Sequence, residues 1–136
     1  MGSILLVEDH KIMAETLVHL LRTKGRFHVA DVSESAEEAM EWLSARKPEH
    51  KVDLALVDVV LPRTSGIELV SMIQQKYPGL PCLMISGRSA GHYVKRSLAA
   101  GARGYVLKDD FHDVMKGIRL VLKGGTYLSQ QLNKEE

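Results

Sequence analysis

Cysteine is nearly absent from this chain of 136 residues, which contains only Cys82. A single cysteine excludes a disulfide within the chain and is typical of proteins in a reducing compartment. Long apolar runs are lacking too, since none approaches the roughly 18 residues of a membrane span and the short apolar start is not a signal peptide. These absences predict a cytoplasmic protein that does not contact a membrane.

An excess of charge of one sign is also lacking. The 18 lysines and arginines nearly balance the 17 acids, and the formal net charge is +1. Such a chain has no field that attracts nucleic acid, and the Lys95-Arg96 pair is too small for a nucleic-acid footprint. The histidines lack the spacing of a metal site, so we interpret all six as structural or solvated: His10, His19, His28, His50, His92 and His112.

Hydrophobic residues make up 45% of the chain, enough for the core of one domain. Five short apolar runs alternate with five segments of helical periodicity, which implies parallel strands with helices on both faces of the sheet. We therefore predict an α/β, flavodoxin-like, doubly wound fold with five helices and a five-stranded parallel sheet in the order 2-1-3-4-5. The predicted strands are Ile4–Val7, Phe27–Val32, Val52–Val57, Pro81–Ile85 and Gly104–Leu107.

Four of these five strands are followed at once by polar or charged residues, namely Glu8 and Asp9, Asp58, Ser86 and Lys108. In the order 2-1-3-4-5 these four strands are consecutive neighbours, and ligands of such sheets bind at the carboxyl ends of the strands. The sequence therefore predicts one row of two acids, a third acid, a hydroxyl and an amine.

This row has a chemical interpretation. Three neighbouring carboxylates raise one another's proton affinity unless a divalent cation neutralises them, and hard oxygen ligands suit Mg²⁺. A carboxylate such as Asp58 can attack phosphorus to give an aspartyl-phosphate. Lys108 and the Ser86 hydroxyl would then bind phosphoryl oxygens.

Four motifs occur in order and carry a family resemblance. Over about Ser3 to Leu132, the chain resembles the receiver domain of a two-component response regulator of the NarL/LuxR type. One such motif is weak evidence, but four at this spacing are strong. The motifs are Val7–His10, Val57–Pro62 with Gly66, Met84–Gly87 and Ala100–Asp109.

The resemblance implies a role for each acid in the row. Asp58 would be the phosphoacceptor. Glu8, Asp9 and Asp58 would arrange Mg²⁺, with Asp9 and Asp58 as the direct carboxylate ligands and the backbone carbonyl of Val60 as a third protein ligand.

The resemblance also implies a switch. Ser86 would turn toward the phosphoryl group, Lys108 would pair with it, and Tyr105 would change rotamer. The phosphoryl donor would be a sensor histidine kinase or a small acyl phosphate, and readout would pass through the fourth helix, fifth strand and fifth helix, with homodimer formation on phosphorylation. The chain would be a signalling domain with self-phosphorylation and slow autodephosphorylation rather than an enzyme.

Three positions in or beside the motifs are expected to influence the site. Gly87 stands where alanine is usual after the hydroxyl residue, which would loosen the backbone there. Val60 and Arg88 occupy variable positions that flank the site, and we expect them to control the access of water to a phosphoryl group.

Several of these residues also have ordinary explanations when taken alone. A carboxylate after a strand, such as Asp58, is more often a loop cap than a nucleophile, and a lysine such as Lys108 is usually solvated. Taken alone, Tyr105 is most simply explained as a partly buried aromatic residue of the core. Pro62 and Gly66 are expected to be turn residues that serve backbone geometry.

Three other functions fit the sequence less well. A haloacid-dehalogenase-like phosphatase has its nucleophile on the first strand and a second aspartate two residues later, whereas Asp58 follows the third strand and Val60 occupies that later position. A dinucleotide-binding module needs a glycine-rich turn where Glu8 and Asp9 would repel a pyrophosphate. A receiver-like interaction domain that is never phosphorylated does not need the acids and Lys108.

We expect the receiver domain to cover residues 3–125. Residues 126–136 are expected to be a C-terminal tail, or the start of a linker to a DNA-binding domain, and residues 126–129 are the part of it suited to packing. Regulators of this type usually continue into a helix-turn-helix domain, which does not follow Leu132 here. DNA binding and control of transcription are thus predicted for a parent protein rather than for this chain. The chain would be either a receiver excised from such a parent or a stand-alone receiver.

Overall fold

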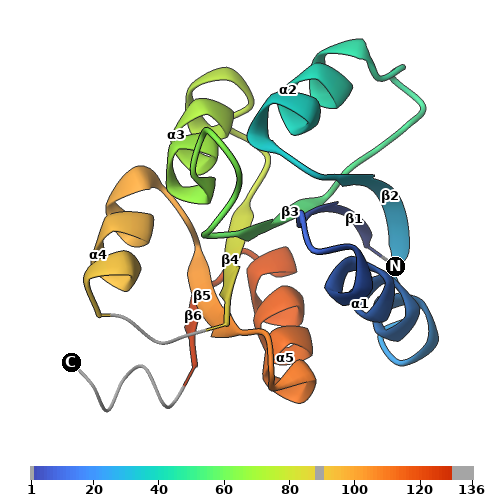
Figure 1. Ribbon diagram of the computed structural model, residues 1–136. Helices are drawn as coiled ribbons and strands as arrows, with labels where there is room; N and C mark the ends of the chain where they lie inside the picture. Colours follow the sequence, from blue (N-terminus) through green and yellow to red (C-terminus); the bar gives the residue numbers. More distant parts are fainter. Residues whose placement is uncertain (1, 88–90, 130–136) are drawn as a thin grey trace.

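A parallel sheet of six strands runs through the middle of the molecule in the order β2-β1-β3-β4-β5-β6 (Figure 1). The structure is a computed structural model that describes residues 2–87 and 91–129. The strands are β1 Ser3–Val7, β2 His28–Ser33, β3 Leu54–Asp58, β4 Cys82–Ser86, β5 Gly104–Leu107 and β6 Tyr127–Leu128. The helices are α1 Lys11–Thr23, α2 Ala36–Ala45, α3 Gly66–Lys76, α4 Gly91–Ala100 and α5 Phe111–Leu122.

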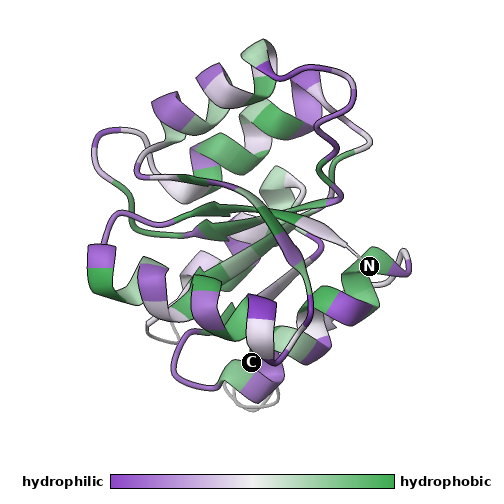
Figure 2. Ribbon diagram, turned by 90° about the vertical axis from the view of Figure 1, so that its right-hand side faces the viewer, coloured by the Kyte–Doolittle hydropathy of each residue, from purple (hydrophilic) through white to green (hydrophobic). Residues whose placement is uncertain are grey.

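Helices cover both faces of the sheet, which Figure 2 shows between two helical layers. Alternate residues of β3 feed two separate cores: Ala55 and Val57 pack with α2, α3 and α4, whereas Leu54 and Leu56 pack with α1 and α5. Every residue of β3 is buried, which explains why its sequence is a continuous apolar run rather than an alternating one. The predicted α/β doubly wound fold with five helices is therefore confirmed.

The predicted number of strands was wrong, because the sheet has a sixth strand beyond the order 2-1-3-4-5. Within the segment predicted as a tail, β6 pairs with β5: the Tyr127 amide donates to the Arg103 carbonyl at 3.1 Å and the Ser129 amide donates to the Tyr105 carbonyl at 3.1 Å. A strand of two residues has no periodicity that a sequence pattern can reveal. Residues 130–136 of the predicted tail lie outside the described residues, as does Arg88.

Side chains also hold β6 in place. Both the Tyr127 hydroxyl and the Ser129 hydroxyl donate hydrogen bonds to the carboxylate of Asp113, in the first turn of α5. The Ser129 side chain is buried as a result. The chain after α5 is thus anchored to the edge of the sheet next to Tyr105.

Candidate functional site

The carboxyl ends of β1, β3, β4 and β5 meet at one edge of the sheet and bring the predicted polar row together. The register sets Val7 beside Val57, Asp58 beside Ile85 and Ser86 beside Leu107. The residues that follow β1 and β5 therefore lie next to the ends of β3 and β4. Turns of backbone fix this edge, since the Lys108 amide donates to the Ser86 carbonyl at 2.8 Å.

Lys108 joins two of the predicted acids. Its Nζ lies 2.5 Å from Glu8 Oε1 and 2.6 Å from Asp58 Oδ2. The side chains of Glu8 and Asp58 are 0% and 3% exposed, and that of Lys108 is 10% exposed. Because buried charges require partners, this ammonium group stabilises two carboxylates that solvent cannot reach.

Burial raises the pKa of Asp58 to about 6, with the Lys108 ammonium opposing this rise and the charge of Glu8 adding to it. Burial also acts to raise the pKa of Glu8, but hydrogen bonds from Lys108 and from the His10 backbone outweigh it and lower this pKa. The two carboxylates raise the pKa of Lys108 against the effect of burial. A proton taken up by the pair of acids therefore binds to Asp58, and Lys108 stays charged.

The loop after β3 holds the second oxygen of Asp58. The backbone N–H of Val60 donates to Asp58 Oδ1 at 3.1 Å, while the Val60 side chain is exposed. One face of the Asp58 carboxylate is thus fixed by Lys108 and the other by this loop.

Gly66 lies directly against the backbone of Asp58. A Cβ atom at Gly66 would stand 1.9 Å from the Asp58 carbonyl oxygen, and the Gly66 amide donates to the Val59 carbonyl at 2.9 Å. Gly66 was expected to be a turn residue, but it is the first residue of α3 and its missing side chain permits close approach of two backbones. The N-cap of this helix is Ser65, which accepts from the Glu68 amide at 3.2 Å.

Helix α2 tethers the same loop, which sequence reasoning missed. Glu37 accepts a hydrogen bond from Thr64 Oγ1 at 2.5 Å and lies 3.6 Å from Arg63 Nη2. Arg63 has a φ of 63°, an uncommon left-handed conformation for a residue with a side chain. No short-range pattern could reveal the tether, because Glu37 and Thr64 are 27 residues apart.

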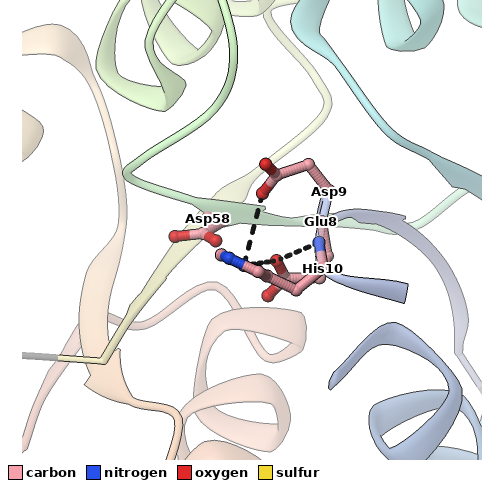
Figure 3. A group of neighbouring side chains, drawn as sticks. All are labelled: Glu8, Asp9, His10 and Asp58. Carbon is pink, nitrogen blue, oxygen red and sulfur yellow. Dashed lines mark hydrogen bonds and ion pairs between the residues drawn. The ribbon is translucent and has the colours of Figure 1, made fainter. Parts of the chain in front are cut away.

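Four side chains at this edge have ligand atoms that lie within 4.8 Å of one another: Glu8, Asp9, His10 and Asp58 (Figure 3). The three carboxylates of this cluster outnumber the single ammonium group of Lys108, which contacts Glu8 and Asp58, so the ionised cluster has an excess of negative charge. Asp9 Oδ1 is inaccessible to solvent and accepts no hydrogen bond among the described residues. Hard oxygen donors with an unsatisfied buried atom fit a divalent cation such as Mg²⁺.

His10 is the fourth member of this group. We interpreted it from the sequence as structural or solvated, and its side chain is 71% exposed. It directly follows Glu8 and Asp9 in the sequence.

The family model for the response regulator receiver domain matches residues 4–122 of this chain. The chain belongs to the response regulator receiver domain family. Receiver domains are signalling domains rather than classical enzymes, and the relatives place this one with the LuxR/NarL-type regulators.

Curated relatives of this receiver domain are transcriptional regulators. The DNA-binding transcriptional activator DevR/DosR of Mycobacterium tuberculosis is 35% identical over 120 residues, which are 88% of this chain and 51% of that protein. The transcriptional regulatory protein DegU of Brevibacillus brevis is 29% identical over 126 residues, 92% of this chain and 52% of that protein. The chain thus spans about half the length of these relatives.

Solved structures agree with this assignment. A LuxR-family two-component response regulator from Aurantimonas sp. SI85-9A1 has a TM-score of 0.89 and 26% identity, and covers 99% of this chain and 94% of that one. A CheY-like receiver domain protein from Methanospirillum hungatei JF-1 has a TM-score of 0.77 and 25% identity, with 100% and 99% coverage. In the part of the receiver that the structure describes, every helix is too short or too polar to cross a membrane.

Tyr105 and Ser86 lie at the rear of the receiver site. Tyr105 is fully buried, and burial raises its pKa, whereas the Ser86 side chain opposes that rise and the Asp58 charge adds to it. The Tyr105 hydroxyl group therefore lies within electrostatic reach of both Ser86 and Asp58. The structure thus brings together all seven predicted site residues: Glu8, Asp9, Asp58, Val60, Ser86, Tyr105 and Lys108.

Proposed function

We propose that this receiver domain accepts a phosphoryl group on Asp58. One observation carries the proposal: the Asp58 carboxylate is buried at the end of β3, with Lys108 Nζ 2.6 Å from one oxygen and the Val60 N–H 3.1 Å from the other. A buried carboxylate with two fixed donors is suited to hold extra negative charge on the same side chain.

The donor in this proposal is the phosphohistidine of a sensor histidine kinase or a small acyl phosphate such as acetyl phosphate. A carboxylate oxygen of Asp58 attacks phosphorus, and the new P–O bond forms as the P–N or P–O bond of the donor breaks. The electron pair of the broken bond leaves with the imidazole or the carboxylate of the donor. Lys108 and the Ser86 hydroxyl bind phosphoryl oxygens as they transfer.

The metal of this reaction would be Mg²⁺. Glu8, Asp9, Asp58 and the backbone carbonyl of Val60 would hold it, with Asp9 and Asp58 as direct ligands. When bound, it neutralises charge on the carboxylates and on the phosphoryl oxygens. The unsatisfied Asp9 Oδ1 and the excess of acids over Lys108 support this assignment.

Phosphorylation then switches an output surface made by α4, β5 and α5. Ser86 moves toward the phosphoryl group and Tyr105 changes rotamer, which favours a homodimer. In a longer parent protein with a helix-turn-helix domain, this change would alter DNA binding and transcription, in keeping with the curated relatives. The location in this proposal is the cytoplasm, where the kinase would present its phosphohistidine.

The domain also hydrolyses its own aspartyl-phosphate slowly, without releasing a metabolic product. The alternative function is a receiver-like interaction domain that acts without phosphorylation. The intact acid and lysine set, with Lys108 contacting both Glu8 and Asp58, favours the phosphorylated form.

Intact-mass spectrometry tests the proposal. Incubation with acetyl phosphate and Mg²⁺ should add one acid-labile phosphoryl group to the wild type and none to Asp58→Asn. If Asp58→Asn is labelled as much as the wild type, Asp58 is not the phosphoacceptor. No labelling of the wild type with acetyl phosphate or with other small acyl phosphates would favour the interaction domain.

A further inference from the structure

The imidazole of His10 lies against the two carboxylates that precede it. Its Nδ1 is 3.3 Å from Glu8 Oε2 and 3.5 Å from Asp9 Oδ1 (Figure 3). The His10 backbone N–H also donates to Glu8 Oε2, at 3.1 Å. A nitrogen ligand therefore stands beside the oxygen ligands of the proposed metal site.

The spacing of these atoms fits one shared ion. Two ligand atoms bound at about 2.1 Å lie about 3.0 Å apart at a right angle and about 3.4 Å apart at the tetrahedral angle. The distances of 3.3 and 3.5 Å from His10 Nδ1 match the tetrahedral value. Asp58 supplies a fourth ligand atom, and the four atoms lie within 4.8 Å of one another. Ligand atoms on opposite sides of an ion lie at most about 4.2 Å apart, so binding one ion would draw this set together.

The two oxygens of Glu8 face different groups. Oε1 contacts Lys108 Nζ at 2.5 Å, whereas Oε2 faces His10. The ammonium group therefore lies on one side of the Glu8 carboxylate and the imidazole on the other. An ion bound at the His10 side avoids Lys108 and reaches Asp9 Oδ1, the buried oxygen that accepts no hydrogen bond among the described residues.

The His10 side chain forms a hydrogen bond with Glu8 Oε2 and does not cap the helix that it precedes. His10 is the N-cap residue of α1, but its side chain makes no capping hydrogen bond. Serine, threonine, asparagine and aspartate are the residues that favour this position. The side chain is 71% exposed, so an ion can reach it from solvent and its replacement should not disturb the core.

Carboxylate oxygens suit Mg²⁺, whereas imidazole nitrogen suits zinc and its neighbours among the transition metals. We propose that His10 is a ligand of this site for a divalent transition-metal ion of the zinc type, and that it makes the site bind Zn²⁺ more tightly than Mg²⁺. The inference rests on the proposed metal site of Glu8, Asp9 and Asp58. It does not require phosphoryl transfer, and Zn²⁺ bound there would exclude Mg²⁺.

Calorimetric titration of the folded chain with Zn²⁺ and, separately, with Mg²⁺ tests the inference. The wild type should bind one Zn²⁺ more tightly than Mg²⁺. His10→Gln should weaken Zn²⁺ binding by about tenfold or more and leave Mg²⁺ binding nearly unchanged. His19→Gln, which changes an exposed histidine of α1, is the matched control and should behave as the wild type.

Nitrogen-15 spectra of the histidine side chains provide a second readout that does not depend on activity. Zn²⁺ should move the imidazole signal that is lost in His10→Gln. Equal Zn²⁺ affinity of His10→Gln and wild type, or a shift confined to another histidine, would overturn the inference. If acetyl phosphate fails to label the wild type while the Zn²⁺ difference remains, the proposed function fails and the inference stands.

Discussion

Gly66 stands so close to Asp58 that a Cβ atom there would lie 1.9 Å from the Asp58 carbonyl oxygen and 2.8 Å from its carbonyl carbon. Both of these atoms are backbone, so neither can move without shifting the end of β3. The first turn of α3 thus sets the position of the residue that we propose as phosphoacceptor.

Gly66→Ala should therefore destabilise the protein and misplace Asp58. We expect a loss of about 3 kcal/mol in the free energy of unfolding, because overpacking against backbone cannot relax by rotamer change. The initial rate of labelling by acetyl phosphate should fall as well. Urea unfolding and timed mass spectra measure the two effects.

Gly79→Ala is the matched control, because a Cβ atom at Gly79 meets no atom within 4 Å. It should change stability by less than about 0.5 kcal/mol, as is usual for surface positions. A Gly66→Ala protein as stable as the Gly79→Ala protein would show that the contact with Asp58 is not restrictive.

Asp58→Asn should stabilise the domain at neutral pH in the absence of divalent cations. The pKa of Asp58 is raised from 3.8 to about 6 in the folded state. A carboxyl group whose pKa is raised by folding stabilises the folded state at pH values below its pKa in the unfolded chain. This stabilisation is lost as the pH rises through its pKa in the folded protein. At about pH 7.5 the variant should thus gain about 1–3 kcal/mol over the wild type.

This gain should shrink as the pH falls from about 6 toward about 4, where the wild-type carboxyl is protonated as well. Chemical unfolding at several pH values, with a chelator present, measures the difference. If the difference in free energy of unfolding between Asp58→Asn and the wild type stays constant from about pH 4 to about pH 7.5, burial of the Asp58 charge does not cause it.

Lys108→Met should reduce both stability and phosphorylation. Without the ammonium group, Glu8 and Asp58 remain buried with no cation, and loss of one partner of a buried pair costs about 3–5 kcal/mol. The cost should grow with pH, because protonation of Asp58 relieves it in acid. Labelling by acetyl phosphate should drop at least about tenfold if Lys108 binds the phosphoryl group.

Lys51→Met, which changes an exposed lysine before β3, is its control. It should leave both stability and labelling unchanged. Similar labelling of the Lys108→Met and Lys51→Met proteins would remove Lys108 from the proposed transfer.

Asp113→Ala should release β6 from the sheet edge. The variant loses the acceptor of both the Tyr127 and Ser129 hydroxyls, and hydrogen bonds to a charged group contribute about 1.5–3 kcal/mol. The amides of Tyr127 and Ser129, which donate to the carbonyls of Arg103 and Tyr105, should then exchange hydrogen faster. Hydrogen exchange read by mass spectrometry measures this.

Lys116→Ala, an exposed substitution on the same helix, should leave exchange in this segment as it is in the wild type. If these amides exchange as slowly in the Asp113→Ala protein as in the wild type, the backbone pairing alone holds β6.

The sequence predicted most of the fold because parallel strands buried on both faces are continuous apolar runs. Ile4–Val7 and Leu54–Val57 could be recognised without any knowledge of their partners. β6 was missed because its two residues depend on the exposed edge of β5 and on Asp113, neither of which a local pattern contains.

The candidate site likewise has features that the sequence could predict and features that it could not. Glu8, Asp9, Asp58, Ser86 and Lys108 could be predicted to meet, because they lie at the carboxyl ends of strands whose order could be predicted. The tether from Glu37 to Thr64, the approach of Gly66 to Asp58 and the turn of His10 toward its neighbours could not. Each depends on side-chain rotamers or on contacts between elements far apart in the chain, which sequence spacing does not fix.

The most direct test of the account is the location of the phosphoryl group. After incubation with acetyl phosphate and Mg²⁺, borohydride converts an aspartyl-phosphate to homoserine, which tandem mass spectrometry of peptides can assign to a residue. We predict homoserine at position 58, with residues 9, 53 and 109 unmodified. Homoserine at another aspartate, with Asp58 intact, would contradict the account.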